Sequence, residues 1–260
     1  MAHPETSLTD TSGDPAMLER NVARRVLAEV RWSFRWPCNW LLGVGLNLAL
    51  SLLWLAWVPL RGGRHADSVI LVGTYFAVFI MADVTTTNVL GLDAARVRVG
   101  RSLGVPIRRV LLTKNFALLI IVGLPTLVLT AILTVRSELP YRLVLTLPGV
   151  ALPMMAWLGV GNLVSVLLPV ATRPLRQRAR ELSDLSATAR WLCHLVVPYA
   201  LLYAVDPVGD TPRLLSRLLP RQWRLPEVRG LLVTGTGLAI WVAGTVLAGW
   251  LVSRRGLRLR

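Results

Sequence analysis

The sequence predicts an all-α, polytopic membrane protein with six transmembrane helices, and three observations lead to this prediction. First, the 260-residue chain is 54% hydrophobic and 17% charged, whereas a soluble domain carries about 25% charged residues. Second, several apolar segments reach the length of about 20 residues that a membrane-spanning helix needs. Third, 29 Lys and Arg residues outnumber 14 Asp and Glu residues, and they gather between the apolar segments. This composition argues against a soluble globular enzyme.

The N-terminal region divides into two parts. Residues 1–15 are rich in Ser, Thr, Asp, Gly and Pro, which predicts a disordered cytosolic tail. Residues 16–36 combine an apolar stripe with a face of arginines and end in Trp32 and Trp36. This pattern predicts an amphipathic helix that lies on the inner leaflet just before the first span. A cytosolic helix packed on a partner is the alternative.

Residues 37–260 form the predicted transmembrane domain. The fourth span contains Pro148 and Pro153, so we expect it to be kinked or tilted. The fifth span is the weakest, because its apolar run is short and contains Pro198. It is retained because the loop charges favour an even number of spans. The predicted spans cover about residues 39–60, 68–91, 115–135, 143–170, 188–206 and 230–252.

The distribution of basic residues predicts the orientation of the spans. Of the 29 Lys and Arg residues, 20 lie in the two terminal segments and in the second and fourth loops, and nine lie in the other three loops. The positive-inside rule then places both termini in the cytoplasm. This asymmetry explains the net charge of +15 without a nucleic-acid partner. The external loop at 206–229 is basic as well, and its helically spaced leucines indicate an interfacial or re-entrant element.

The chain lacks the common motifs of catalytic and cofactor sites. It contains no GxxxxGK[ST] sequence for a nucleotide phosphate, no HExxH for a catalytic metal and no GxSxG for a serine nucleophile. Its two cysteines and three histidines are scattered, so we expect neither a disulfide framework nor a metal site. We therefore expect no catalytic, cofactor-binding or metal-binding residues and do not regard the chain as an enzyme.

Four polar residues inside the predicted spans are candidates for a role beyond packing. A carboxylate there costs about 2.5–3.5 kcal/mol, so Asp83 needs a partner or water. It serves either a translocation pathway or proton relay, or it pairs near the interface with an arginine of the second loop. His194 is interpreted as a structural hydrogen-bonding residue. The candidate intramembrane polar residues are Asp83, Asn88, Asn162 and His194.

The second loop, residues 91–115, is the most informative segment. Asp93 is placed to cap a short helix, and Pro106 precedes the third span. Apolar residues lie among arginines here, as in an element that enters a partner's groove and pairs with an acidic rim. The alternative is an ordinary solvated loop that follows the positive-inside rule. The candidate docking residues are Asp93, Arg96, Arg98, Arg101, Leu103, Pro106, Arg108 and Arg109.

Three short motifs in and around this loop carry a resemblance to a known family. They are Asn88-x-x-Gly91-x-Asp93, then Pro106-Ile-Arg-Arg-x-Leu-Leu-x-x-Lys114-Asn115, and finally Gly161-Asn162-Leu-Val-Ser165-Val-Leu-Leu-Pro169. With these motifs the chain resembles the membrane-spanning permease subunit of type-2 ABC transporters. This class includes many bacterial drug and polysaccharide exporters.

The resemblance implies partners and a location. It implies a coupling helix near residues 94–104 that docks on a separate ABC-type ATPase subunit, which would bind ATP and Mg²⁺. It also implies a second permease subunit, identical or different, in the lipid of the bacterial cytoplasmic (inner) membrane. Small residues four apart, at Gly45/Ala49 and Gly244/Ala248, allow close helix approach at such a dimer interface or within the subunit. Other hypotheses are a secondary transporter that uses Asp83 and a non-transporting membrane scaffold.

Overall fold

The protein is all-helical in the residues that its structure, a computed structural model, describes. These are residues 22–35, 84–137, 139–169 and 225–257, with isolated residues between 186 and 220. Within these ranges the all-α prediction is confirmed, and no strand is present. The helices are α2 (Val22–Ser33), α5 (Val84–Thr87), α6 (Ala94–Ser102), α7 (Ile107–Leu118), η3 (Leu119–Gly123), α8 (Leu124–Ser137), η4 (Pro140–Arg142), α9 (Leu143–Leu167) and α13 (Pro226–Arg255).

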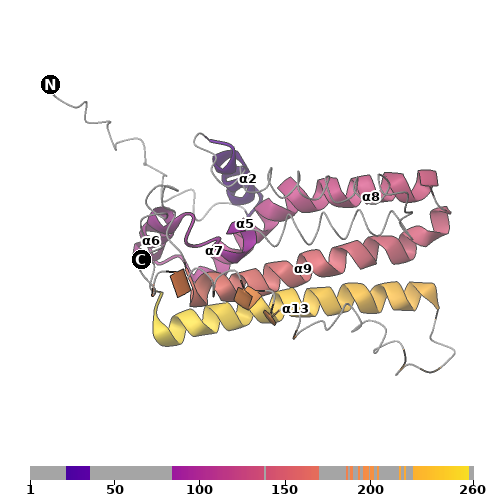
Figure 1. The fold of residues 1–260 in the computed structure, drawn as a ribbon. Coiled ribbons are helices and arrows are strands. Elements are labelled where there is room, and N and C mark those ends of the chain that lie inside the picture. The colour runs from indigo at the N-terminus through magenta and orange to yellow at the C-terminus, as the bar shows by residue number, and fades with distance from the viewer. Residues whose placement is uncertain are drawn as a thin grey trace.

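Three long helices are apolar enough to cross a membrane (Figure 1). They run through Ile107–Arg136, Pro140–Leu167 and Pro226–Arg255. At 1.5 Å per residue, a helix of 30 residues is about 45 Å long, which exceeds a hydrocarbon core of about 30 Å. They correspond to the spans predicted at 115–135, 143–170 and 230–252. The predicted spans at 39–60 and 188–206, most of 68–91 and the N-terminal tail lie largely or wholly outside the described residues.

Among the predicted span boundaries that differ from the structure, two bear on the end of the bundle that carries α6. The third helix begins at Ile107 rather than at residue 115, because the basic segment that follows Pro106 continues the apolar helix without a break. Pro106 has the extended backbone expected just before a helix (φ −67°, ψ 137°). The described end of the second span is helical only to Thr87 rather than to residue 91. There the backbone N–H of Val89 donates instead to the Ser165 hydroxyl on α9, at 3.0 Å.

Glycines set the packing of α13 on α9. Gly230, Gly237 and Gly244 are seven residues apart and all meet α9, so the two helices run in parallel along their length (Figure 1). A Cβ on Gly244 would lie 2.3 Å from the carbonyl oxygen of Gly159. Only glycine permits this approach, which brings the two backbones together as in other membrane helix pairs. Packing within the subunit therefore accounts for Gly244 and Ala248, one of the two alternatives that the sequence leaves open.

Two apolar clusters lie along the bundle. The first joins α7, α9 and α13 around Trp157, which is fully buried. The second lies at the end where α6 packs, and the fully buried Leu111 belongs to it. Its members come from α6, α7, α13 and the turn after α5: Leu90, Val97, Ile107, Leu111, Ala248 and Val252. The second cluster fixes α6 against the ends of α7 and α13.

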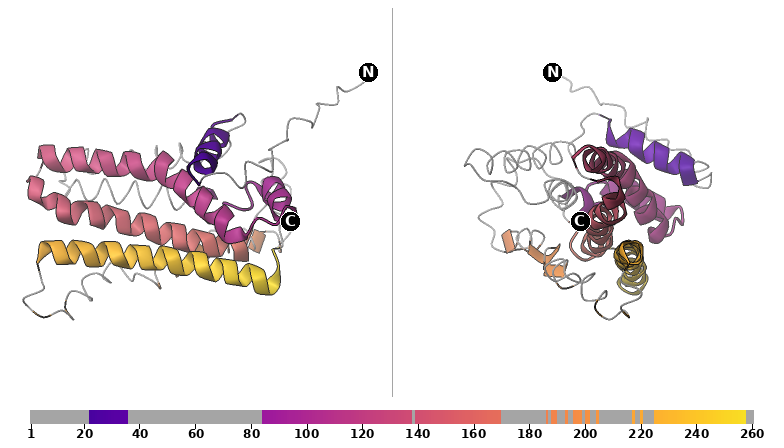
Figure 2. Two further views of the ribbon diagram at one scale, coloured as in Figure 1. Left: turned by 180° about the vertical axis from the view of Figure 1, so that it is seen from behind. Right: turned by 90° about the vertical axis from the view of Figure 1, so that its right-hand side faces the viewer.

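Helix α2 lies across the long helices rather than along them, near the end of the bundle that carries α6 (Figure 2). Only two of its residues, Val26 and Glu29, are buried. The C-terminal end of α13 reaches the same end of the bundle, where Leu257 packs on the second apolar cluster. Helix α2, helix α6 and the end of α13 thus share one end, and η4 lies at the other (Figure 1).

Candidate functional site

A small apolar patch framed by arginines marks the outer surface of α6. Val99 and Leu103 are 60% and 51% exposed, and their spacing of four residues places them on the same side of the helix. Arg98 and Arg101 are exposed beside them. We refer to these four residues as the docking face. Such a patch suits a partner with an apolar groove and an acidic rim.

A helix-ending turn and one buried valine position the docking face. Val97 is 2% exposed and belongs to the second apolar cluster, so the opposite side of α6 points outward. Gly104 has a positive φ of 79°. Its N–H donates to the Arg101 carbonyl, and the Val105 N–H donates to the Gly100 carbonyl, both at 3.0 Å. This pair of hydrogen bonds is the Schellman motif, which requires a residue in the left-handed region and therefore favours glycine.

Seven of the eight candidate docking residues are exposed, and only Asp93 is buried. Three of the eight also contact other parts of the fold. The side chain of Arg108 lies over α13, where a Cβ on Gly249 would come within 2.4 Å of its Nε atom. Asp93 and Arg96 take part in a cluster of charged side chains. The seven exposed residues are Arg96, Arg98, Arg101, Leu103, Pro106, Arg108 and Arg109.

Asp93 occupies the expected capping position, but the expected capping hydrogen bond from its side chain is not formed. Asp93 does occupy the position just before α6, and its carbonyl accepts the Val97 N–H at 3.0 Å. Its side chain makes no capping hydrogen bond. Instead the carboxylate accepts a hydrogen bond from the Lys114 ammonium at 2.9 Å. A full positive charge is a stronger partner for this buried carboxylate than the backbone amides at the start of α6.

Four charged side chains form a closed ring of alternating sign. Lys114 Nζ lies 2.7 Å from Glu29 Oε1 and 2.9 Å from Asp93 Oδ2. Arg96 bonds Glu29 Oε2 and lies 3.4 Å from Asp93 Oδ2. We refer to Glu29, Asp93, Arg96 and Lys114 as the charge ring. Two acids and two bases make it electrically neutral, which suits burial.

The charge ring is buried and is covered by an aromatic side chain. Its members are 6–7% exposed except Arg96, which is 46% exposed. The indole of Trp32 lies 4.5 Å from the Arg96 guanidinium carbon and 5.3 Å from Lys114 Nζ, measured from the ring centroid. Burial raises the pKa of the Glu29 carboxyl, but the charges and hydrogen bonds of Lys114 and Arg96 outweigh it. The pKa of Glu29 therefore lies below its ordinary value of 4.5.

The sequence interpretation missed Glu29 and assigned no role to Lys114. Two signals pointed to them. Glu29 lies three residues after Val26 and interrupts the apolar side of its helix. Lys114 is the only lysine among 29 basic residues. Lysine concentrates its charge in one compact ammonium group that fits between two carboxylates, whereas arginine carries a broad planar fork.

The candidate intramembrane residues Asn88 and Asn162 are buried where α5, α9 and α13 meet. The Asn162 amide donates to the Thr245 hydroxyl at 2.8 Å. Asn88 is 1% exposed in the turn after α5, next to the Val89 amide that Ser165 binds. Asn162 and Ser165 belong to one motif of the family resemblance, so that motif joins helices at this point. Asp83 and His194 lie outside the described residues.

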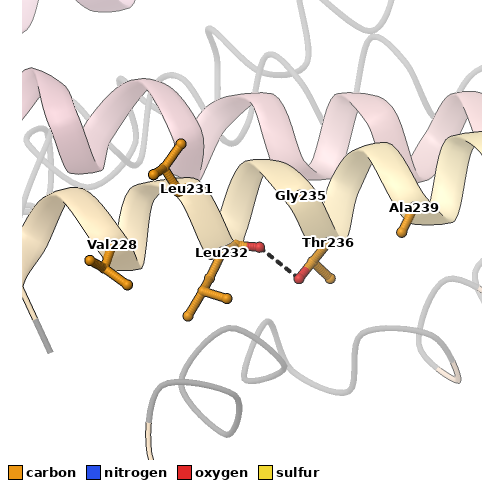
Figure 3. Close-up of a pocket in the computed structure, with 6 residues that line it drawn as sticks. All are labelled: Val228, Leu231, Leu232, Gly235, Thr236 and Ala239. Atoms are coloured by element: carbon orange, nitrogen blue, oxygen red, sulfur yellow. Dashed lines mark hydrogen bonds between the residues drawn. The ribbon is translucent and has the colours of Figure 1, made fainter. Parts of the chain in front are cut away.

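The pocket on the first half of α13 has a different character. Its lining is almost entirely apolar (Figure 3). The hydroxyl of Thr236, its one polar side chain, donates to the Leu232 carbonyl at 2.8 Å within the helix. Apart from that hydroxyl, the described lining side chains offer a ligand no polar group. The lining residues are Val228, Leu231, Leu232, Gly235, Thr236 and Ala239.

Neither the arrangement of possible metal ligands nor the comparison with known proteins indicates a further site in the described residues. Within the described residues, no group of three His, Cys, Asp or Glu side chains is arranged to hold a metal ion. The two ring carboxylates, Glu29 and Asp93, are already bound by cations. A comparison of the chain with protein-family models, curated proteins and solved structures found no match.

Proposed function

We propose that this chain is the permease subunit of an ABC exporter and that α6 is its coupling helix. The observation that carries the proposal is the docking face, in which Val99 and Leu103 are exposed together with Arg98 and Arg101 of the same short helix. Beneath it, the buried Val97 and the charge ring hold α6 against the ends of α7 and α13. An exposed patch on a firmly held helix suits the transmission of force from a partner protein.

The positions of the motif residues support the proposed family. The residues that carry the resemblance lie far apart in the sequence, yet they contact one another in the fold. Asp93 of the first motif binds Lys114 of the second. Ser165 of the third motif accepts the Val89 amide within the first. Residues of all three motifs thus hold together the end of the bundle that carries α6.

The proposed orientation places α6 in the cytoplasm of a bacterium. Three helices are long and apolar enough to span the inner membrane. Exposed arginines of α6, Arg254 and Arg255 share one end of the bundle (Figure 1). The positive-inside rule assigns that end to the cytoplasm. The full proposal has six spans, with both termini cytoplasmic.

The exposed side of α2 supports its proposed position on the inner leaflet. Leu27 and Phe34 are about half exposed, and Ala23 lies on the same side of the helix. A neighbouring strip of the surface carries three exposed arginines: Arg24, Arg31 and Arg35. An apolar strip beside a basic one suits a helix that lies between lipid chains and anionic headgroups.

The proposed mechanism is alternating access. Two partner ATPase subunits bind ATP and Mg²⁺ and close on each other, and each moves the α6 of one permease subunit. Because α6 packs on α7 and on the end of α13, its movement shifts the ends of two spans. ATP thereby favours one orientation of the pathway over the other. Leu-, Val- and Trp-rich spans suit an amphipathic or lipid-like cargo.

The proposal predicts an ABC-type ATPase encoded in an adjacent reading frame, and complex formation with that ATPase tests it. The permease in lipid nanodiscs is expected to bind this ATPase. Replacing Arg98 and Arg101 together by Glu is expected to weaken binding at least tenfold, because the docking face then repels an acidic rim. The control is Arg136→Glu. Arg136 lies in the last turn of α8, at the end of the bundle away from α6, so this variant should bind the ATPase normally. Unchanged binding by the double variant would refute the docking role of α6.

A further inference from the structure

Glu29 links α2 to two elements that lie far from it in the sequence. Its carboxylate bonds Arg96 of α6, 67 residues away, and Lys114 of α7, 85 residues away. Asp93 then joins the same two cations from the start of α6. Each acid therefore contacts both bases, and each base contacts both acids. Because the ring is closed, loss of one member removes one of the two partners from each of its two neighbours.

The attachment of α2 is largely polar. Among its described apolar residues only Val26 is buried, while Val22, Leu27 and Phe34 are about half exposed. Glu29 and Trp32, three residues apart, lie on the same side of the helix and both meet the ring cations. Two contacts one turn apart fix both the rotation of α2 and its position along its own axis.

We infer that Glu29 is a positioning residue, and that the charge ring makes α2, α6 and α7 move as one body. A shift of α6 is then carried directly to α2, which lies across the bundle (Figure 2). Three of the four ring members are also buried. Salt therefore weakens the attraction between their charges less than it weakens a surface ion pair. This inference concerns the chain alone and does not depend on the identity of a partner.

The inference is tested by measuring distances between spin labels on the full chain in nanodiscs, without any ATPase. Cys38 and Cys193 are first replaced by Ser. One label pair joins exposed positions of α2 and α6, Ala28 and Ser102. A reference pair joins Ser102 to Ser253 on α13, so it reports the fold of the bundle without α2. Both pairs are expected to give a single narrow distance distribution in the parent protein.

Glu29→Gln is expected to broaden the Ala28–Ser102 distribution at least twofold and to leave the Ser102–Ser253 distribution unchanged. The matched control is Glu227→Gln, an exposed carboxylate at the start of α13, which should leave both unchanged. A narrow Ala28–Ser102 distribution in Glu29→Gln would overturn the inference.

If Glu29→Gln broadens both pairs, Arg96→Gln decides, because Arg96 is half exposed and its loss perturbs the fold less. Broadening of the Ala28–Ser102 pair alone in Arg96→Gln supports the inference, and no broadening overturns it.

Discussion

Lys114 keeps its charge in a buried position because two carboxylates meet it within 3 Å. Removing one member of a buried ion pair costs about 3–5 kcal/mol, since the partners left behind are charged and cannot reach water. The same reasoning distinguishes Lys114 from Arg109 on the same helix, which is exposed. In the positive-inside count Lys114 and Arg109 were equivalent. Only the fold shows that Lys114 is buried and Arg109 is exposed.

At the residue scale, Lys114→Met is predicted to lower the free energy of unfolding by about 3–5 kcal/mol. The measurement is unfolding of the purified protein in mixed detergent micelles. Arg109→Met serves as the control and should change stability by no more than about 0.5 kcal/mol. Equal effects of the two substitutions would show that Lys114 is not held in a buried ring.

Glu29, one of the two acids in the ring, gives a pH dependence of known sign. The pKa of Glu29 in the folded protein is below its ordinary value of 4.5. Its charged form therefore stabilises the fold above pH 4.5, and this contribution disappears as the pH falls through the lower folded pKa. The stability difference between the native protein and Glu29→Gln should be constant from neutral pH to about 4.5 and shrink below it. A difference that already shrinks at neutral pH would contradict the ring geometry.

At the scale of elements, the contact between α9 and α13 depends on backbone proximity. Gly244→Ala is predicted to destabilise the protein by about 1–3 kcal/mol, because the added Cβ would overlap the Gly159 carbonyl. Gly235→Ala on the same helix is the matched control, since nothing lies within 4 Å of its new Cβ. That change should be neutral or stabilise the helix by up to about 1 kcal/mol. Thermal unfolding in nanodiscs would compare them, and similar shifts would argue against the close approach.

The sequence predicted elements better than their ends and contacts. Long apolar segments are visible in one sequence, so helices at the predicted spans 115–135, 143–170 and 230–252 were expected, although α9 ends at Leu167. The start of α7 was not, because Arg108 and Lys114 interrupt the apolar pattern without interrupting the helix. The chemistry of Asp93 was missed for a related reason. Its partner comes from another helix, and local capping patterns contain no information about such a residue.

At the scale of the whole molecule, the proposed orientation in the membrane depends on which segments share an end of the bundle. Helix α6 and the end of α13 lie together, and η4 lies at the other end (Figure 1). Cysteines placed at Ser102 and Ser253 are therefore predicted to react with a membrane-impermeant thiol reagent from the cytoplasmic side. A cysteine at Tyr141, which is 68% exposed in η4, should react from the outside. The measurement uses cysteine-free protein in right-side-out and inverted vesicles, and same-side labelling of Tyr141 and Ser102 would contradict this orientation.

Contacts between distant parts of the chain account for what the sequence could not reveal. Glu29 and Lys114 are 85 residues apart, and no periodic pattern connects them. The docking face is easier to anticipate, because arginines and apolar residues alternate within one short loop. Its division into an exposed part and a buried ring is set by the packing of α6 on α7 and α13, which depends on the whole bundle.

The central claim is that α6 couples this chain to an ATPase, and ATP hydrolysis by that ATPase tests it most directly. Under the proposed function, this chain in nanodiscs is predicted to change the hydrolysis rate of its partner, an ABC-type ATPase expected in an adjacent reading frame, at least severalfold. Replacing Val99 and Leu103 by Asp should abolish that change, because both side chains are exposed and their loss leaves the core intact. Hydrolysis that is indifferent to the permease, or coupling that survives the loss of Val99 and Leu103, would contradict the account.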